Sequence, residues 1–242
     1  MNVETVLLSD VPLGTPDARS EELTSFLRGI RCTRIVLKGD IIDGGSWKRG
    51  FFWRRSHTRC LQELLRKRDE EGVELIYLRG NHDDFLDAVM PVQFGSLHIA
   101  EEYRHWTPQG EYLVLHGDGF GPGRFWLTLM GSVLYELVLR GDRLLHAYQR
   151  WQGHLYGSYG KYLHRSQFAQ AQLAQFEETL AGVAAKRGCR GVICGHIHIP
   201  ADRQIGEVRY MNSGDWIHSL TAVVEETPGK FRLISYAEFQ RE

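Results

Sequence analysis

Five short apolar segments of the chain each end in polar residues that can bind metal ions. These segments are Thr5–Leu8 before Asp10, Arg34–Leu37 before Asp40, Glu74–Leu78 before Asn81 and His82, Tyr112–Leu115 before His116, and Val192–Cys194 before His196 and His198. Short apolar runs of this kind are typical of buried strands. Because ligands of parallel sheets bind beyond the carboxyl ends of the strands, we expect these polar residues to form one site.

Helical patterns lie between the early strands, at Glu21–Arg28 and Thr58–Glu71. This alternation of strands and helices is typical of an α/β fold with parallel strands. Residues 125–186 are rich in aromatic and aliphatic side chains and predict a helical insertion between two strands. Gln204–Tyr236 alternates apolar and polar residues, which predicts short antiparallel strands.

Length and composition narrow the class of protein. The 242 residues fit one domain with a sizeable core, so we predict a single domain over residues 1–242 with a helical cap at about 120–185. The formal net charge of −1 gives no electrostatic basis for nucleic-acid binding, and no nucleic-acid partner is expected. The four cysteines form no CxxC pair, and the sequence shows no signal peptide and no membrane-spanning run, so we expect a cytoplasmic protein.

The strand-end residues combine the ligand types that bind divalent transition metals. Carboxylate, amide and imidazole ligands are supplied by Asp10, Asp40, Asn81, His116, His196 and His198. This mixture suits Mn, Fe or Zn. Two such ions about 3.5–4 Å apart can clamp a phosphoryl group and acidify the water that attacks it. The sequence therefore predicts a metal centre suited to phosphate chemistry.

The order of these motifs resembles that of the calcineurin-like metallophosphoesterase family over roughly residues 5–220. The motifs are Asp10-x-Pro12, Gly39-Asp40, Gly80-Asn81-His82-Asp83, His116-Gly117 and Gly195-His196-x-His198. The resemblance implies a sandwich of two sheets flanked by helices, and metal-dependent hydrolysis of phosphate esters. It also implies two metal sites with Mn as the expected ion: Asp10, Asp40 and His198 at the first, and Asp40, Asn81, His116 and His196 at the second. Asp40 would bridge the ions, and His82 would approach the phosphate, so Asp40 and His82 are the catalytic candidates.

One position departs from the family pattern, which begins D-x-H. Pro12 stands where the pattern has histidine, and a proline side chain cannot bind a metal. We therefore predict a weakened first site, for which Asp43 and His57 are the candidate replacement ligands. We expect Asp83 and Asp118 to be structural residues or to orient a ligand histidine, rather than to bind the metal themselves, and Asp43 to be a loop or capping residue. A non-catalytic protein that binds metal or phosphate is the alternative to an enzyme.

Within the family the chain is similar to the UDP-2,3-diacylglucosamine hydrolase group, which cleaves a pyrophosphate in lipid A synthesis. The similarity lies in Leu13-Gly14, Gly117-Asp118, the helical insertion and Gly195–Ala201, whereas His82 replaces the arginine of that group's GNRD motif. It implies a lipid-linked nucleotide as substrate and a peripheral contact with the inner membrane surface. The candidate substrate-binding residues are Arg124, Arg143, Trp126 and Tyr135. Helix packing or a dimer contact is the alternative role of the insertion, and a soluble phosphodiester or phosphomonoester is the alternative substrate.

Overall fold

The computed structural model describes residues 1–45, 50, 52–120 and 167–242. The chain divides into two compact units, one made of residues 1–118 and 181–242 and the other of residues 119–180. Most of the predicted helical cap, residues 121–166, lies outside the described residues. Helix α6, Gln167–Lys186, follows these residues. Within the described ranges, no helix has the length and apolar character needed to cross a membrane.

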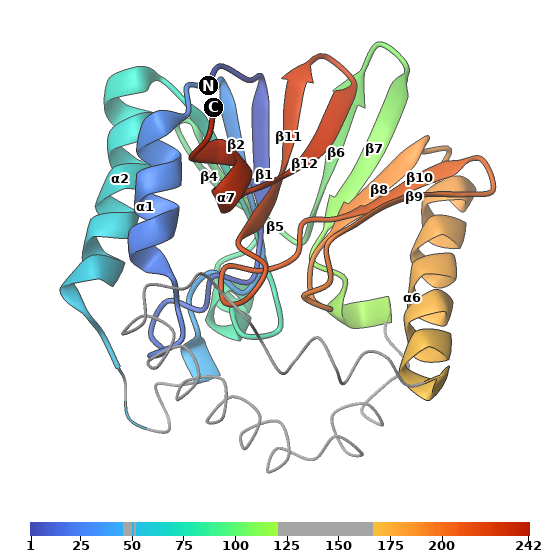
Figure 1. Ribbon diagram of the computed structural model, residues 1–242, viewed down its shortest axis with the longest axis horizontal. Coiled ribbons are helices and arrows are strands. Elements are labelled where there is room, and N and C mark those ends of the chain that lie inside the picture. The colour runs from blue at the N-terminus through green and yellow to red at the C-terminus, as the bar shows by residue number, and fades with distance from the viewer. Residues whose placement is uncertain (46–49, 51, 121–166) are drawn as a thin grey trace. The chain divides into compact units, whose positions relative to one another are not determined.

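Two β-sheets form the framework of the first unit (Figure 1). The strands of the larger sheet are β1 Thr5–Leu8, β2 Arg34–Lys38, β3 Glu74–Leu78, β4 Val92–Phe94, β5 Leu97–Ala100, β11 Thr221–Thr227 and β12 Lys230–Ser235. The strands of the smaller sheet are β6 Glu102–Thr107, β7 Gly110–Leu115, β8 Gly191–Cys194, β9 Ala201–Ile205 and β10 Val208–Asn212. In the described part of the chain the orders are β12-β11-β1-β2-β3-β5-β4 and β6-β7-β8-β10-β9.

The strands that precede the predicted ligands run parallel to their neighbours. In the larger sheet, β1, β2, β3 and β5 pair in parallel, and β4, β11 and β12 add antiparallel edges. In the smaller sheet, β7, β8 and β10 are parallel, and β6 and β9 are antiparallel. The carboxyl ends of β1, β2 and β3 therefore lie along one edge of their sheet, and those of β7 and β8 lie along one edge of the other.

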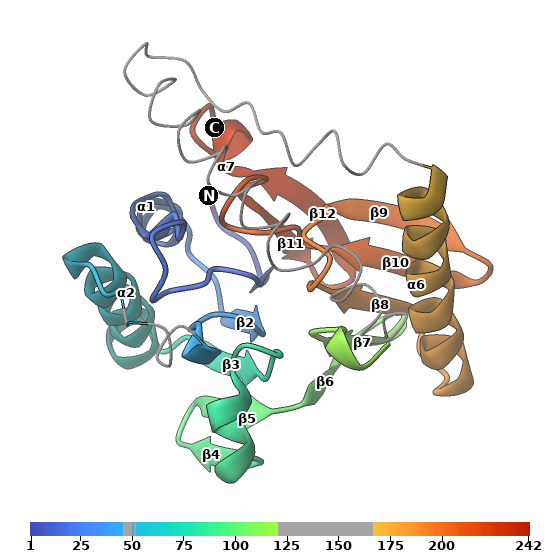
Figure 2. The same cartoon turned by 90° about the horizontal axis from the view of Figure 1, so that it is seen from below.

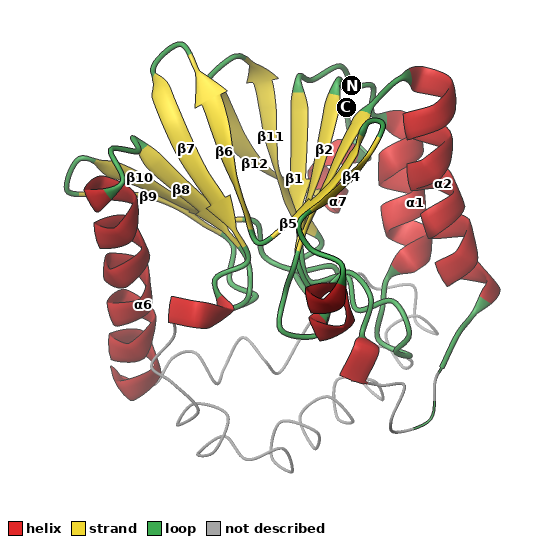
Figure 3. Cartoon of the chain, turned by 180° about the vertical axis from the view of Figure 1, so that it is seen from behind, coloured by secondary structure: helices red, strands yellow, loops and turns green. Residues whose placement is uncertain are grey.

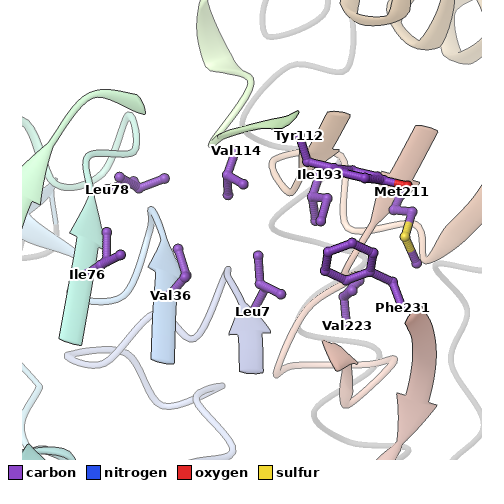
Figure 4. Packing of buried hydrophobic residues seen from close by; sticks show 10 residues of the cluster. All are labelled: Leu7, Val36, Ile76, Leu78, Tyr112, Val114, Ile193, Met211, Val223 and Phe231. Carbon is purple, nitrogen blue, oxygen red and sulfur yellow. The ribbon is translucent and has the colours of Figure 1, made fainter. Parts of the chain in front are cut away.

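Apolar side chains from both sheets meet in the core between them (Figure 4). The larger sheet contributes Leu7, Val36, Ile76, Leu78, Val223 and Phe231, and the smaller sheet contributes Tyr112, Val114, Ile193 and Met211. Burying each such side chain contributes roughly 1.5–3 kcal/mol. This core fixes the spacing between the two sheets, and so between the two groups of strand ends.

Helices cover the outer face of the larger sheet, where α1 Ser20–Gly29 and α2 Arg55–Glu71 lie side by side (Figures 2 and 3). Leu23, Phe26 and Leu27 form the buried face of α1. The α2 helix ends at Glu71 and is capped by Gly72, whose left-handed conformation (φ 71°) is one that glycine adopts easily. The short elements are the 3₁₀ turns η2 Asp84–Ala88 and η3 Asp118–Phe120 and the C-terminal helix α7 Tyr236–Phe239. The architecture confirms the predicted sandwich of two sheets flanked by helices.

Candidate metal centre

All six predicted ligands follow the carboxyl ends of strands. Asp10, Asp40 and Asn81 follow β1, β2 and β3 of the larger sheet. His116 follows β7, and His196 and His198 follow β8 in the smaller sheet. Both sheets of the sandwich thus contribute candidate metal ligands.

Four of these residues have a backbone conformation that is rare for residues other than glycine. Asp10, Asp40, His196 and His198 have φ values of 56°, 54°, 69° and 59°. Among the described residues, only one other non-glycine residue, Leu220, has a positive φ. The left-handed region costs an L-residue about 1–2 kcal/mol, and such strain gathers at functional sites. The fold therefore imposes an unfavourable conformation on the residues that the sequence singles out.

The centre of the site is a buried cluster of Asp10, Asp40 and His116. One ligand atom from each of these residues lies within 4.8 Å of the others. His116 Nε2 lies 3.3 Å from Asp40 Oδ2, and His116 Nδ1 is 2.8 Å from the backbone carbonyl oxygen of Lys38. A donated hydrogen bond from Nδ1 to this carbonyl orients the ring so that Nε2 faces Asp40. Holding a ligand histidine through its second nitrogen is a common feature of metal sites.

One buried carboxylate oxygen in this cluster has no hydrogen-bond partner. The Asp10 side chain is fully buried, and its Oδ1 accepts no hydrogen bond. Its Oδ2 accepts one from the backbone amide of His196 at 3.1 Å. The His198 imidazole faces Oδ1 at 3.4 Å, but a buried carboxylate oxygen that accepts no hydrogen bond is costly, because the hydrogen bonds it made to water are not replaced. A divalent cation beside Asp10 and Asp40 would remove that cost, so these residues fit a metal ion.

The remaining predicted ligands surround the buried cluster. His198 Nε2 lies 3.4 Å from Asp10 Oδ1, and Asn81 Oδ1 lies 3.3 Å from His116 Nε2. The rings of His196 and His116 have their centroids 5.1 Å apart. Asn81 is exposed and His196 and His198 are partly exposed, whereas the cluster beneath them is buried. The floor of the site is therefore a buried cluster that contains two carboxylates, and its rim is accessible to a ligand.

The ring of His198 is oriented by an aspartate that the sequence motifs did not single out as a site residue. The Nδ1 atom of His198 lies 3.0 Å from Asp215 Oδ2. The other oxygen of Asp215 accepts hydrogen bonds from the backbone amides of His218 and Ser219. Asp215 is thus fixed in place and directs the Nε2 atom of His198 toward Asp10. This pairing of a carboxylate, a histidine and a metal position is typical of metalloenzymes.

His82 stands at the rim and is held by two aspartates. Its ring Nδ1 lies 3.1 Å from Asp43 Oδ1, and its Nε2 lies 4.0 Å from Asp40 Oδ2. Its backbone amide donates to Asp40 Oδ1 at 2.8 Å. The hydrogen bond to Asp43, opposed by burial, raises the pKa of His82. An imidazole that is 44% exposed, and more easily protonated than usual, is placed to donate a proton to a ligand over the cluster.

Two glycines allow these side chains to come close together. A Cβ atom at Gly80 would lie 2.2 Å from Asp40 Oδ1, and one at Gly39 would lie 2.6 Å from the ring of His116. Gly39 also has a φ of 81°, which a residue with a side chain rarely adopts. Their presence in the Gly39-Asp40 and Gly80-Asn81 motifs is therefore a steric requirement of the cluster.

A model of the calcineurin-like phosphoesterase family matches residues 6–200, which is well over half of the chain. The chain belongs to this family. No curated protein sequence matches it at a significant level.

Several solved structures of phosphoesterases and related proteins are similar to this family member. Yfce, a phosphoesterase from E. coli, is 14% identical, with 96% of this chain and 92% of that chain covered and a TM-score of 0.49. An archaeal phosphodiesterase is 14% identical, with 95% and 98% covered and a TM-score of 0.46. Vps29 from Chaetomium thermophilum is 11% identical, with 95% and 85% covered and a TM-score of 0.46. Because these scores lie below 0.5, the family assignment rests on the sequence match.

Asp83 and Asp118, the acidic residues next to the ligands, have structural roles rather than the alternative role of orienting a ligand histidine. Asp83 accepts hydrogen bonds from the backbone amides of Asp40 and Ile42 and from the Tyr77 hydroxyl. It therefore shapes the turn that carries Asp40. Asp118 forms an ion pair with Arg79 at 2.6 Å.

Neither candidate replacement for the missing histidine belongs to the buried cluster. Asp43 is not simply a loop or capping residue, since it binds His82, and His57 Nδ1 accepts a hydrogen bond from the amide of Gly14. Within the described part of the chain, the buried Asp10–Asp40–His116 group includes neither of them. The predicted substrate-binding residues Arg124, Trp126, Tyr135 and Arg143 lie outside the described residues.

The protonation of the histidines predicts that metal binding releases a proton. Burial lowers the pKa of His116, but the Asp40 carboxylate outweighs it and raises this pKa to about 10. Burial and the nearby His116 lower the pKa of His196 to about 4. At pH 7 the metal-free protein thus has a protonated His116 and a neutral His196. Since a ligand imidazole must be neutral, an ion bound to both displaces about one proton.

We therefore expect the apparent affinity for Mn²⁺ to rise roughly tenfold per pH unit between pH 6 and 9. Isothermal titration calorimetry in two buffers of different ionisation enthalpy measures the number of protons released. Binding with no proton release and no dependence on pH would show that His116 is not a ligand.

Proposed function

We propose that the chain is a metal-dependent hydrolase of phosphate esters or pyrophosphates, acting at the Asp10–Asp40–His116 centre. The observation that carries this proposal is the buried cluster itself, with an Asp10 oxygen that has no hydrogen-bond partner. A cluster of two buried carboxylates is costly without a cation. The family to which the chain belongs is described as a phosphoesterase family, which agrees with this chemistry.

A divalent cation at this centre would neutralise phosphate charge and make a bound water more acidic. The residues that would hold it are Asp10, Asp40, Asn81, His116, His196 and His198, and we propose Mn as the ion, with Fe and Zn as alternatives. We propose Asp40 as the residue shared by both metal positions; its Oδ2 lies 3.3 Å from His116 Nε2, and its Oδ1 accepts a hydrogen bond from the amide of His82.

His82 supplies the proton chemistry of the proposed reaction. Its Nδ1 atom is held by Asp43, so its Nε2 is the nitrogen left to face a substrate above the cluster. Because the pKa of His82 is raised, the ring carries a proton at neutral pH more often than a free histidine. We propose that this proton goes to the leaving oxygen or stabilises negative charge on the phosphoryl group.

For the substrate, we propose the pyrophosphate of UDP-2,3-diacylglucosamine or of a similar lipid-linked nucleotide. The support is the similarity of Gly117-Asp118 and of Gly195–Ala201 to that hydrolase group, together with an aromatic and basic insertion suited to acyl chains and phosphate. Access to such a lipid implies a peripheral contact with the inner membrane surface.

The test combines metal analysis with two substrates. The purified chain is loaded with Mn, Fe or Zn, its metal content is measured, and hydrolysis of UDP-2,3-diacylglucosamine is compared with that of bis(p-nitrophenyl) phosphate. Release of UMP from the lipid nucleotide at a much higher kcat/KM supports the full proposal. Turnover of the chromogenic diester alone would favour a soluble phosphodiester or phosphomonoester as substrate.

Pro12 favours one alternative function, a non-catalytic protein that binds metal or phosphate. The position two residues after Asp10 provides no side-chain ligand. The first metal site, the Asp10 half of the centre, therefore has fewer predicted protein ligands than the second site, the half around His116. Metal bound in stoichiometric amounts without turnover of any of these substrates would support this alternative.

A further inference from the structure

The segment that leads into α2 carries aromatic and basic side chains that have no part in the proposed reaction. The Phe52 side chain is 37% exposed, and the side chain of Trp53 is half-buried. Arg54, Arg55 and Arg59 are exposed. Arg55 and Arg59 lie about one turn apart on α2, so their side chains extend from the same face of the helix. We call these residues, Phe52, Trp53, Arg54, Arg55 and Arg59, the arginine–aromatic surface.

The arginines of this surface have no acidic partner. Within the described residues none of them forms an ion pair, whereas Arg66, farther along α2, pairs with Glu63 and Glu71. The first turn of α2 holds no acidic residue, and the sequence has none between Asp43 and Glu63. The surface is therefore a local concentration of positive charge in a chain whose formal net charge is −1.

Contacts within the chain hold the aromatic rings of this surface in place. The guanidinium carbon of Arg54 lies 4.8 Å from the centre of the Phe52 ring. The indole Nε1 of Trp53 donates a hydrogen bond to Thr58 Oγ1 at 2.8 Å. The Trp53 ring stands at 88° to the buried His57 ring, with the ring centres 5.3 Å apart. Because the rings are ordered in advance, a partner that binds them loses less conformational entropy.

The arginine–aromatic surface lies at the end of the larger sheet that carries metal ligands. The α2 helix leads directly into β3, whose carboxyl end precedes Asn81, so the first turn of α2 lies at that same end (Figure 1). His57 in this turn accepts a hydrogen bond at 3.2 Å from the amide of Gly14, in the loop that follows Asp10. A broad partner that rests on this surface therefore approaches the protein from the side of the metal centre.

Both a membrane and a nucleic acid can bind aromatic and basic side chains, and the structure favours the membrane. Tryptophan and arginine are typical of the boundary between lipid and water, and clustered arginines bind anionic lipids. Single-stranded nucleic acids instead stack their bases on open aromatic faces, and the guanidinium of Arg54 already lies over the Phe52 ring. The chain as a whole also has no excess of positive charge to hold a long polyanion.

We propose that the arginine–aromatic surface is the contact of this protein with an anionic lipid bilayer. The inference rests on the proposed function, since it names the surface that brings the metal centre to a lipid-linked substrate. The rings of Phe52 and Trp53 enter the headgroup region, and the arginines bind the lipid phosphates. Each arginine close to an anionic membrane strengthens binding by about fivefold.

The test is sedimentation of the full chain with vesicles of equimolar phosphatidylglycerol and phosphatidylcholine, and with vesicles of phosphatidylcholine alone. The wild type should bind the anionic vesicles much more tightly than the neutral ones, and added salt should weaken this binding. Arg55→Gln/Arg59→Gln should bind the anionic vesicles roughly twentyfold more weakly, because it removes two exposed charges. Phe52→Ser should bind them roughly tenfold more weakly, because it removes an apolar ring.

Arg66→Gln/Arg68→Gln is the matched control, because it removes the same charge from the same helix at arginines that have acidic partners. It should bind vesicles as the wild type does. Every variant should hydrolyse bis(p-nitrophenyl) phosphate at the wild-type rate, because none of these residues belongs to the centre. Equal vesicle binding by the wild type and Arg55→Gln/Arg59→Gln would overturn the inference alone, as would a wild type that binds a single-stranded oligonucleotide but no vesicles. A wild type that binds anionic vesicles through this surface but hydrolyses no substrate would overturn the proposed function and not the contact.

Discussion

Replacing Asp40 with asparagine should abolish tight metal binding and lower kcat/KM for any phosphodiester substrate by about a thousandfold or more. Asp40 is the carboxylate shared by both predicted sites: its Oδ2 lies 3.3 Å from His116 Nε2, its Oδ1 accepts from the amide of His82, and it clusters with Asp10 within 4.8 Å. An amide nitrogen at either position removes the negative charge and turns an acceptor into a donor. The expected loss therefore combines weaker cation binding with a misplaced His82.

The measurement is metal content together with steady-state kinetics at saturating Mn. Asp202→Asn is the matched control, because Asp202, on β9, forms a partly exposed ion pair with Arg209 on β10, outside the centre. The control should retain wild-type metal content and turnover. Near-normal turnover in Asp40→Asn would place the chemistry elsewhere in the protein.

Replacing Pro12 with histidine should create a second metal equivalent and increase turnover. An imidazole two residues after Asp10 would add a fourth protein ligand to the half that has Asp10, Asp40 and His198. We expect this second equivalent to bind at least tenfold more tightly than in the wild type, which corresponds to about 1.4 kcal/mol. Hydrolysis of the substrate that the wild type uses should rise by a similar factor. Calorimetry and kinetics at fixed Mn test the two effects separately.

Pro16→His is the matched control for this substitution. It makes the same change at an exposed position four residues later in the same loop. It should bind metal as the wild type does, apart from weak surface binding. If the wild type already holds two tight equivalents, position 12 is not a defect, and the proposed imbalance between the two halves is wrong.

The sequence predicted those parts of the fold that carry strong local patterns. Thr5–Leu8 and Glu74–Leu78 are strands with the predicted bounds, since their buried runs end at clear turn signals. Strands β4 and β6 were not predicted, because Val92–Phe94 and Glu102–Thr107 lie at the sheet edges, with largely exposed or half-buried side chains. Strand β5 was also missed, since its four residues, Leu97–Ala100, are only half-buried. An edge strand of this kind has no continuous apolar run from which it could be identified.

The supporting residues of the centre were harder to find than the residues they support. The ligand motifs follow from strand ends, but the contacts of Lys38 with Cys194 and Ser213 join residues 156 and 175 positions apart. No spacing rule links such residues, and a lone lysine at a strand end would normally be assigned to the surface. Asp43 was expected to be a loop residue for the same reason, because its partner His82 lies 39 positions away.

Because the proposed metal ligands follow strands of two different sheets, the affinity for metal depends on the apolar core between those sheets. Asp10, Asp40 and Asn81 move with the larger sheet, and His116, His196 and His198 move with the smaller one. The distance between these groups is set by the apolar layer that includes Leu7 and Ile193. A change in the volume of either side chain would shift one sheet against the other and alter the distances between the ligand atoms of the two sheets. Selection for tight metal binding therefore also constrains core residues that never touch the ion.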